Sequence, residues 1–268
     1  MGTLVRLEDG WGVDTPVGDT LLHRYVLNLA AYQEAVATAM GGRTLRRDDL
    51  VAADLGHPSG LYNSAVLLRP PERVEDILAD IEAFYDGHGC GDVELWSPWP
   101  TPDLTARGWE LEGHPPLLVR PAGRAPAGVD PPELRIEAVT TATGVRDWER
   151  VAVEGFPFPE VLPWLPGAIA NEKILSDDRT RLWVGYVEDR PVVIGSLFVE
   201  AGIGHLSLGV TLPEARGRGY WAAMARRRLA VLPGLPAAGV FSDMSRPGAE
   251  ARGFLPIVRF TLWRRRRG

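Results

Sequence analysis

The chain has 268 residues, 45% of them hydrophobic and 24% charged, and a formal net charge of −6. These values are typical of a soluble globular protein, and the negative charge argues against nonspecific nucleic-acid binding over the whole surface. No apolar run approaches the roughly 18 residues of a membrane span, and the first residues lack the apolar core of a signal peptide. We therefore expect a cytoplasmic protein without a membrane segment. Cys90 is the only cysteine, which excludes an intrachain disulfide and a cysteine metal cage.

Similar landmarks recur in the two halves of the chain in the same order. Each half has a strand-like run, a Pro-Glu pair, a helical pattern, a second strand and an Ala-Arg-Gly-aromatic turn. In the first half these are 64–69, Pro71-Glu72, 74–85, 93–96 and 106–109, and in the second 204–210, Pro213-Glu214, 219–232, 240–242 and 251–254. We interpret them as an internal repeat. The Pro/Gly/Ala-rich stretch 121–132 is typical of a linker, so we expect one domain over 1–122 and another over 133–268.

The second half predicts an α/β fold with a mixed sheet. Its patterns indicate, in chain order, a strand, a helix, a short helix interrupted by prolines, a hairpin with a third antiparallel strand, a helix and two strands. The ranges are 134–138, 144–153, 160–174, 182–187, 192–199, 204–210, 219–232, 239–242 and 254–263.

The segment 206–224 joins an apolar strand to a helix through an Arg/Gly-rich turn. The first amides of a helix have no partner within it and lie at the positive end of its dipole, so they bind anions. Gly217 and Gly219 let phosphate oxygens approach the main chain, and Arg216 and Arg218 add positive charge. The segment therefore indicates a nucleotide-derived cofactor.

Residues 210–219 are similar to the acetyl-CoA-binding motif of the GNAT superfamily of N-acetyltransferases, Arg/Gln-x-x-Gly-x-Gly/Ala after a strand. Arg216 and Gly219 match the motif, and Trp221 stands where it has Gly or Ala. The resemblance implies two GNAT-like repeats with acetyl-CoA as co-substrate of the second. The first repeat is degenerate, because Glu75 and Ile77 occupy the glycine positions. The implied cofactor-binding residues are Leu208, Val210, Leu212, Arg216, Gly217, Arg218, Gly219, Tyr220 and Trp221.

A Rossmann dinucleotide site is the competing interpretation of the same glycines. Residues 217–222 also fit Gly-x-Gly-x-x-Ala, and Asp243 follows at about the distance of a ribose-binding acid. Only 25 residues follow Asp243, however, too few for the remaining parallel strands. The strands before the glycines also indicate an antiparallel meander.

Acetyl transfer to an amine needs a polarised carbonyl, a neutral amine and a proton for the leaving thiolate. The resemblance assigns the first to a main-chain amide near 209–210, where Gly209 would supply a strand bulge. We expect His205 to be the base, with a surface strand residue as the alternative and Glu200 as a weaker candidate. The family's tyrosine proton donor is replaced here by Ala249, and Ser245 is the candidate substitute.

We expect an N-acetyltransferase in which a primary amine attacks the thioester directly within a ternary complex. The alternative is a CoA-binding regulatory or scaffolding module without turnover. Two features are open to different interpretations. The loop 156–164 either bounds an acceptor pocket or packs on the core, and the arginines of 264–267 form a solvated tail or bind RNA. Nucleic acid is a less expected partner than a small-molecule or peptide amine, whose identity the sequence does not specify, and a homodimer is left open. No metal-ligand spacing occurs among the histidines.

Overall fold

The structure, a computed structural model, describes residues 20–71, 73–89, 91–156 and 158–267. The first 19 residues, Glu72, Cys90, Pro157 and Gly268, with the expectations that concern them, lie outside the described part. The helices are α1 (Leu21–Met40), α2 (Val74–Tyr85), α3 (Ala142–Gly155), α4 (Tyr220–Ala230) and α5 (Arg246–Glu250). The strands are β1 (Arg43–Arg46), β2 (Leu50–Asp54), β3 (Asn63–Leu67), β4 (Asp92–Ser97), β5 (Trp109–Gly113), β6 (Pro116–Arg120), β7 (Arg135–Ala138), β8 (Thr180–Val187), β9 (Arg190–Glu200), β10 (Ile203–His205), β11 (Val210–Thr211), β12 (Ala237–Val240), β13 (Leu255–Arg259) and β14 (Thr261–Arg266).

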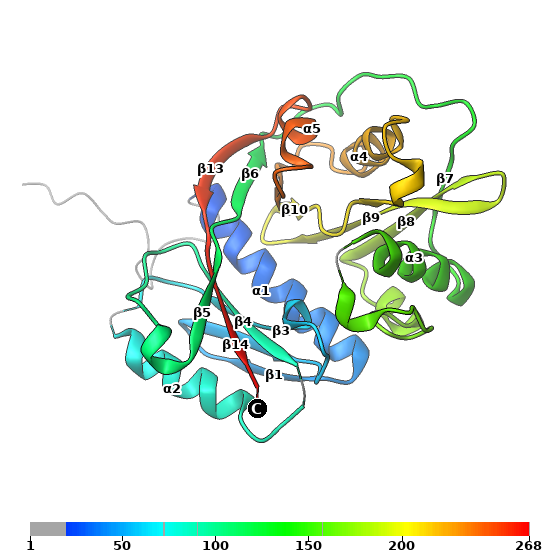
Figure 1. Cartoon of the computed structure of the whole chain (residues 1–268). Helices are drawn as coiled ribbons and strands as arrows, with labels where there is room; N and C mark the ends of the chain where they lie inside the picture. The colour runs from blue at the N-terminus through cyan, green and yellow to red at the C-terminus, as the bar shows by residue number, and fades with distance from the viewer. Residues whose placement is uncertain (1–19, 72, 90, 157, 268) are drawn as a thin grey trace, which may run out of the picture.

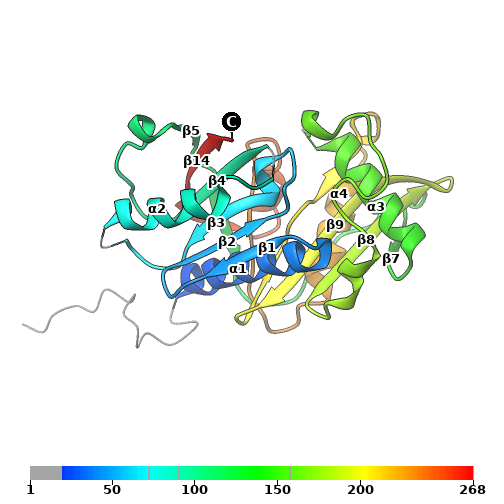
Figure 2. The same cartoon turned by 90° about the horizontal axis from the view of Figure 1, so that it is seen from below.

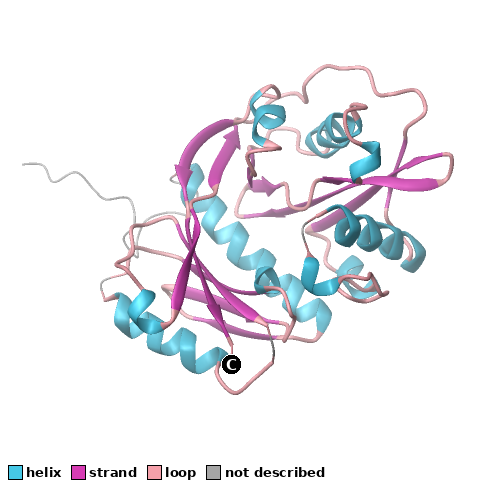
Figure 3. Cartoon of the chain, viewed as in Figure 1, coloured by secondary structure: helices cyan, strands magenta, loops and turns pink. Residues whose placement is uncertain are grey.

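These elements form two lobes, each built on one sheet (Figures 1 and 3). The sheet of the first lobe has the order β1-β2-β3-β4-β14-β5, and that of the second lobe β13-β6-β12-β10-β9-β8-β7, with β11 paired to β9. Helix α2 covers the first sheet, while α3 and α4 pack on the second. The architecture is thus the mixed α/β fold in two similar repeats that the sequence predicts.

The two lobes exchange one strand each. Strand β6, from the first half of the chain, lies between β12 and β13 of the second sheet, and β14 lies between β4 and β5 of the first. All four pairings are antiparallel. The exchange is reciprocal, which supports the internal repeat at the level of topology. The linker 121–132 carries no helix or strand, and the domain division that it suggests stays a prediction.

Helix α1 joins the two sheets. Thr20 caps its first turn by accepting a hydrogen bond from the His23 amide, and Gly41 ends it with φ 78°, a conformation that favours glycine. Its buried residues, which include Tyr25 and Leu29, pack with side chains of both sheets. Figure 2 shows α1 running along the first lobe towards the second. The core is therefore continuous across the lobes.

Three predicted elements differ from the structure. The helix expected over 160–174 is replaced by two 3₁₀ helices, Pro159–Val161 and Glu172–Ser176, because the prolines between them cannot donate helical hydrogen bonds. The strand expected over 204–210 is interrupted between β10 and β11. The closing strand 254–263 divides at Phe260, where the chain passes from one sheet to the other.

Candidate functional site

The Arg/Gly-rich turn adopts a conformation that leaves the start of α4 open. Gly217 and Gly219 have φ values of 78° and 81°, in the left-handed region where a side chain would be strained. Gly219 is the N-cap of α4, and no side chain caps the helix there. Residues 216–219 are exposed. Since the first helical amides lack partners within the helix, this end of α4 can receive an anion.

The side chains around this turn also hold it in place. Arg216 donates from Nε to the oxygen of Thr211 at 3.2 Å and from Nη2 to that of Gly155 at 3.0 Å. The buried Tyr220 donates its hydroxyl to Glu133 at 2.8 Å. Arg216 therefore fixes the strand and α3 relative to the loop, while Arg218 is exposed beside the open helix end.

The corresponding helix of the first lobe lacks these features. Helix α2 begins directly after Arg73, has Glu75 and Asp76 in its first turn, and buries Ile77. Two carboxylates at a helix N-terminus repel an anion that the amides would otherwise attract. The anion-binding geometry is thus specific to the second lobe among the described residues.

The strand before the turn contains a bulge. His205 pairs with Phe198 and Val210 with Ile194, so the stretch 205–210 is one residue longer than the β9 segment opposite. Leu208, with φ 38°, absorbs the extra residue, rather than Gly209. On the other side, the pairing of β10 with β12 ends at the bond from the Leu206 amide to the Ala238 oxygen, 2.8 Å. The two strands separate beyond this bond.

The indole of Trp221 fills part of this separation. Its Nε1 donates to the main-chain oxygen of Gly209 at 3.1 Å, and its ring lies so close to Gly248 of α5 that a Cβ there would be 3.0 Å from it. The guanidinium of Arg252 lies 5.5 Å from the ring centroid. Together, Trp221 at Gly209 and Arg216 at Thr211 engage two successive outward-facing carbonyls of the strand.

His205, the predicted base, is buried against α1. Its Nε2 shares a 3.3 Å hydrogen bond with the hydroxyl of Tyr25, and the rings of Tyr25 and Tyr32 meet it edge-on at 5.2 Å. Burial, followed by the positive charge of Arg228, lowers the pKa of His205 to about 3. The imidazole is therefore neutral at physiological pH. The alternative interpretation placed His205 at the surface, and its burial contradicts that. Its role as a base stays a prediction.

The other predicted catalytic side chains have local partners. The hydroxyl of Ser245, at the N-cap of α5, lies 3.1 Å from that of Ser242. Its role as proton donor stays a prediction. Ala249, at the position of the family's tyrosine, is fully buried. Glu200 accepts from the Ala201 amide and from Arg179, both at 3.0 Å, which places it in the hairpin turn as a structural residue.

A buried carboxylate that sequence reasoning missed holds the segment 164–170, at the end of the loop 156–164. Glu149 of α3 accepts hydrogen bonds from the amides of Ile169, Ala170 and Gly167 at 2.7–2.9 Å, and from Trp164 Nε1 at 3.2 Å. The first lobe holds the same loop from outside, since His57 Nε2 donates to the Ala168 oxygen at 2.8 Å. Glu149 lies among the buried residues of α3. An acidic residue at an apolar position of the helical pattern is the sequence signal that could have predicted a buried carboxylate here.

Part of the loop 156–164 packs on the core and part of it is exposed. Phe158 is buried in the core, whereas Phe156 and Leu162 are exposed. The Phe158 ring lies 6.0 Å from that of Tyr62 in the first lobe. The first lobe therefore supplies part of the wall behind this loop.

The C-terminal arginines are not a solvated tail, which corrects the sequence-based expectation. Residues 264–266 belong to β14. Arg264 pairs with Glu112 at 3.1 Å, Arg265 with Asp86 at 3.1 Å and Arg267 with Asp54 at 2.9 Å. The strand exchange brings these cations to acids of the first lobe, so most of their charge is neutralised there.

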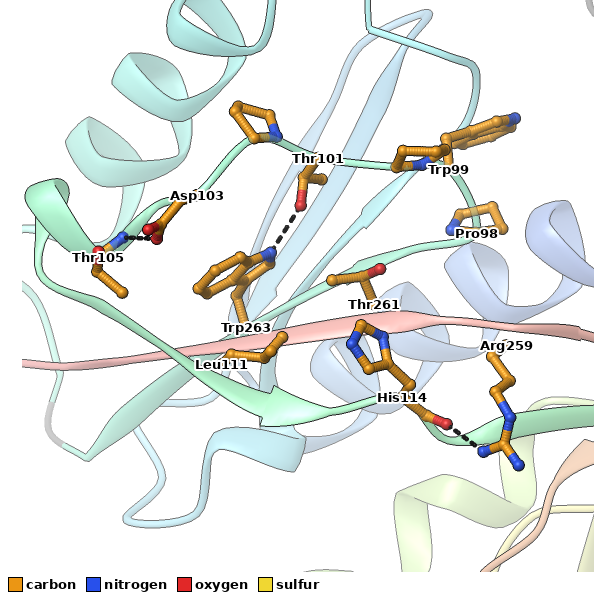
Figure 4. A pocket seen from close by; sticks show the side chains of 12 residues that line it. Pro98, Trp99, Thr101, Asp103, Thr105, Leu111, His114, Arg259, Thr261 and Trp263 are labelled. Carbon is orange, nitrogen blue, oxygen red and sulfur yellow. Dashed lines mark hydrogen bonds between the residues drawn. The ribbon is translucent and has the colours of Figure 1, made fainter.

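A cavity lies away from the turn. It has a volume of about 650 Å³ and is formed in the first lobe by the proline-rich loop after β4 and by β5 and β14. Figure 4 shows two of its lining residues held by hydrogen bonds, Trp263 to the hydroxyl of Thr101 and Arg259 to the main-chain oxygen of His114, both at 2.8 Å. No predicted site residue lines it. Within the described residues there is no group of His, Cys, Asp and Glu that could hold a metal, and no helix has the length and apolar character that a bilayer span requires.

Solved structures with the same fold are known, although the sequence itself matches no family model and no curated protein. A GCN5-related N-acetyltransferase from Kribbella flavida is 17% identical with a TM-score of 0.64, covering 89% of this chain and 96% of its own. A putative GNAT-family acetyltransferase from Novosphingobium aromaticivorans is 19% identical with a TM-score of 0.63, covering 93% and 100%. A tandem GNAT protein from the clavulanic acid biosynthesis pathway is 13% identical with a TM-score of 0.54, covering 94% and 97%. The chain therefore has the GNAT fold over both repeats, as the sequence resemblance implies.

Proposed function

We propose that the protein is an acetyl-CoA-dependent N-acetyltransferase whose cofactor site lies in the second lobe. The observation that carries the proposal is the uncapped N-terminus of α4, preceded by two glycines in the left-handed conformation. Amides there would bind the pyrophosphate, with the exposed Arg218 adding charge and Tyr220 and Arg216 holding the turn in shape. The GNAT fold supports this assignment by analogy.

The strand before α4 is the proposed place of the pantetheine arm, and its free edge is partly occupied. The arm would lie beside Leu208, Val210 and Leu212, where the strand has separated from β12. The indole of Trp221 now bonds the Gly209 oxygen in this space. Binding by this route therefore requires the indole to move aside.

In the proposed reaction a neutral primary amine attacks the thioester carbon. A C–N bond forms, and the carbonyl oxygen gains a negative charge that the amide near 209–210 would stabilise. The C–S bond then breaks with its electron pair on sulfur, and the amine loses one proton. His205 is the proposed acceptor of that proton and Ser245 the proposed donor to the thiolate. The pKa of about 3 makes His205 a weak base.

A thiol-release screen against a diverse amine library tests the proposal. Gly219→Glu, which places a carboxylate at the helix end, should abolish CoA binding in calorimetry and thiol release together. Gly234→Glu is the matched control, because Gly234 is also left-handed, with φ 76°, but lies in the loop after α4. Equal CoA binding by wild type and Gly219→Glu would refute the site.

The second candidate, a CoA-binding regulatory or scaffolding module, is motivated by the occupied strand edge. It predicts measurable CoA binding with thioester loss that no amine accelerates. An amine acceptor, cytoplasmic location and a homodimer remain predictions of the first proposal.

A further inference from the structure

A buried arginine with no acidic partner lies beneath the strand bulge. Arg228 of α4 is 1% exposed. Its Nη1 donates to the main-chain oxygens of Ser196 at 3.3 Å and Ser207 at 3.2 Å, and its Nε has no hydrogen-bond partner. No carboxylate among the described residues forms an ion pair with it. Burial lowers the pKa of Arg228 to about 10, so the group still carries its charge at neutral pH.

Two glycines on adjacent strands make room for this side chain. A Cβ at Gly195 of β9 would lie 2.8 Å from Arg228 Nε, and a Cβ at Gly209 would lie 2.7 Å from Nη2. Any other residue at either position would collide with the guanidinium. The charge therefore lies under the bulge at 208–209, bonded to the main-chain oxygen of Ser207 just before it and to that of Ser196 on the opposite strand.

The positive charge of Arg228 affects a titratable group on the same strand, His205. After burial, the charge of Arg228 is the second cause that lowers the pKa of His205. Tyr25 and Tyr32 of α1 also face His205. Both are uncharged at neutral pH, as tyrosines ordinarily are, and burial raises their pKa values further. No acidic group in these contacts screens the guanidinium.

A buried charge without a counter-ion is costly, since carbonyl dipoles replace its hydration only in part. An apolar side chain of similar length would avoid this cost. A negative charge that forms at the bulge would offset part of this cost.

We propose that Arg228 stabilises the negative charge that develops at the bulge during acyl transfer, first on the carbonyl oxygen beside the 209–210 amide and then on the departing sulfur. This inference rests on the proposed function and extends it. Attack by the amine forms the C–N bond and places a charge on oxygen. Collapse re-forms the carbonyl and breaks the C–S bond with its electron pair on sulfur, while the amine proton passes to solvent or to a base. Because Arg228 is covered by the strand, it acts through its electric field and does not touch the thioester.

The test measures the thiol of bound CoA instead of turnover. The pKa of that thiol is followed by thiolate absorbance in wild type and in Arg228→Met, which keeps length and removes charge. We expect the thiol pKa to rise by about one unit in the variant, a tenfold loss of thiolate preference. Arg228→Lys should retain most of the wild-type value. Arg227→Met, one residue away on the exposed face of α4, should leave it unchanged.

A second measurement needs no variant and covers the case in which Arg228→Met does not fold. In wild type, the affinity for CoA relative to S-methyl-CoA, which cannot ionise, should increase as the pH rises through the thiol pKa. A constant ratio, or the same thiol pKa in Arg228→Met, would overturn the inference while leaving CoA binding intact. Absence of any CoA binding to wild type would overturn the proposed function itself.

Discussion

Trp221 Nε1 donates a 3.1 Å hydrogen bond to the main-chain oxygen of Gly209, which joins the first turn of α4 to the strand before it. The indole thereby occupies the position at which an extended ligand would pair with the strand. Gly209 and Gly248 accommodate the ring from two sides, because a Cβ at either would lie within 3.1 Å of it. The tryptophan that replaces the small residue of the motif at 221 is thus accommodated by glycines elsewhere in the chain.

Trp221→Ala should bind CoA more tightly than wild type. The substitution removes a competing hydrogen bond of about 1 kcal/mol, which corresponds to about a fivefold gain in affinity. Trp221→Phe keeps the ring without the donor and should fall between the two. Isothermal calorimetry measures all three. A weaker Trp221→Ala complex would show that the indole is a ligand contact and not an obstacle.

The sequence predicted the parts of this arrangement that depend on neighbouring residues. The order of strand, Arg/Gly turn and helix around Gly217 and Gly219 follows from local patterns, as does the hairpin of β8 and β9. The patterns could not assign β6 and β14 to their sheets, because an apolar run specifies a strand but not a partner far away in the chain. The burial of His205 was missed for the same reason, since α1 covers it from the other half of the chain.

Glu149→Gln should destabilise the protein by about 3 kcal/mol or more, because the carboxylate is fully buried and accepts four hydrogen bonds. The amide of glutamine would turn N–H groups towards two of those donors. Urea denaturation measures the loss, and hydrogen exchange should show faster opening of 167–170. Glu154→Gln on the same helix removes an exposed ion pair with Arg150 and should change little. Equal stability of the two variants would contradict the role of Glu149.

His205 should make the protein sensitive to acid. Burial and then Arg228 lower its pKa from 6.5 to about 3, so the unfolded chain takes up a proton at higher pH than the folded one. Its contribution to stability is therefore complete above about pH 6.5 and is lost as the pH falls towards 3. His205→Gln should flatten the denaturation profile in this window, whereas the exposed His114→Gln should not.

Activity gives an independent check on the same group. If His205 is the base, the acid limb that remains after correction for protonation of the amine substrate should lie near pH 3. An acid limb near neutrality that survives in His205→Gln would assign proton transfer to another group. An acid limb near neutrality that disappears in His205→Gln would contradict the low pKa of His205.

Arg267→Ala should destabilise the first lobe, although the residue belongs to the far end of the chain. Arg267 donates from Nη2 and Nη1 to Asp54 at 2.9 and 3.2 Å, and the two side chains are 8% and 2% exposed. Asp54 keeps its 2.8 Å ion pair with Arg43 in this variant, so the loss is that of the charge-assisted hydrogen bonds from one of two cations, about 1.5–3 kcal/mol. The exposed Arg266→Ala should be nearly neutral. Chemical denaturation with first-lobe tryptophan fluorescence distinguishes the variants. Loss of RNA binding from both variants, without loss of stability, would instead favour the tail as a nucleic-acid contact.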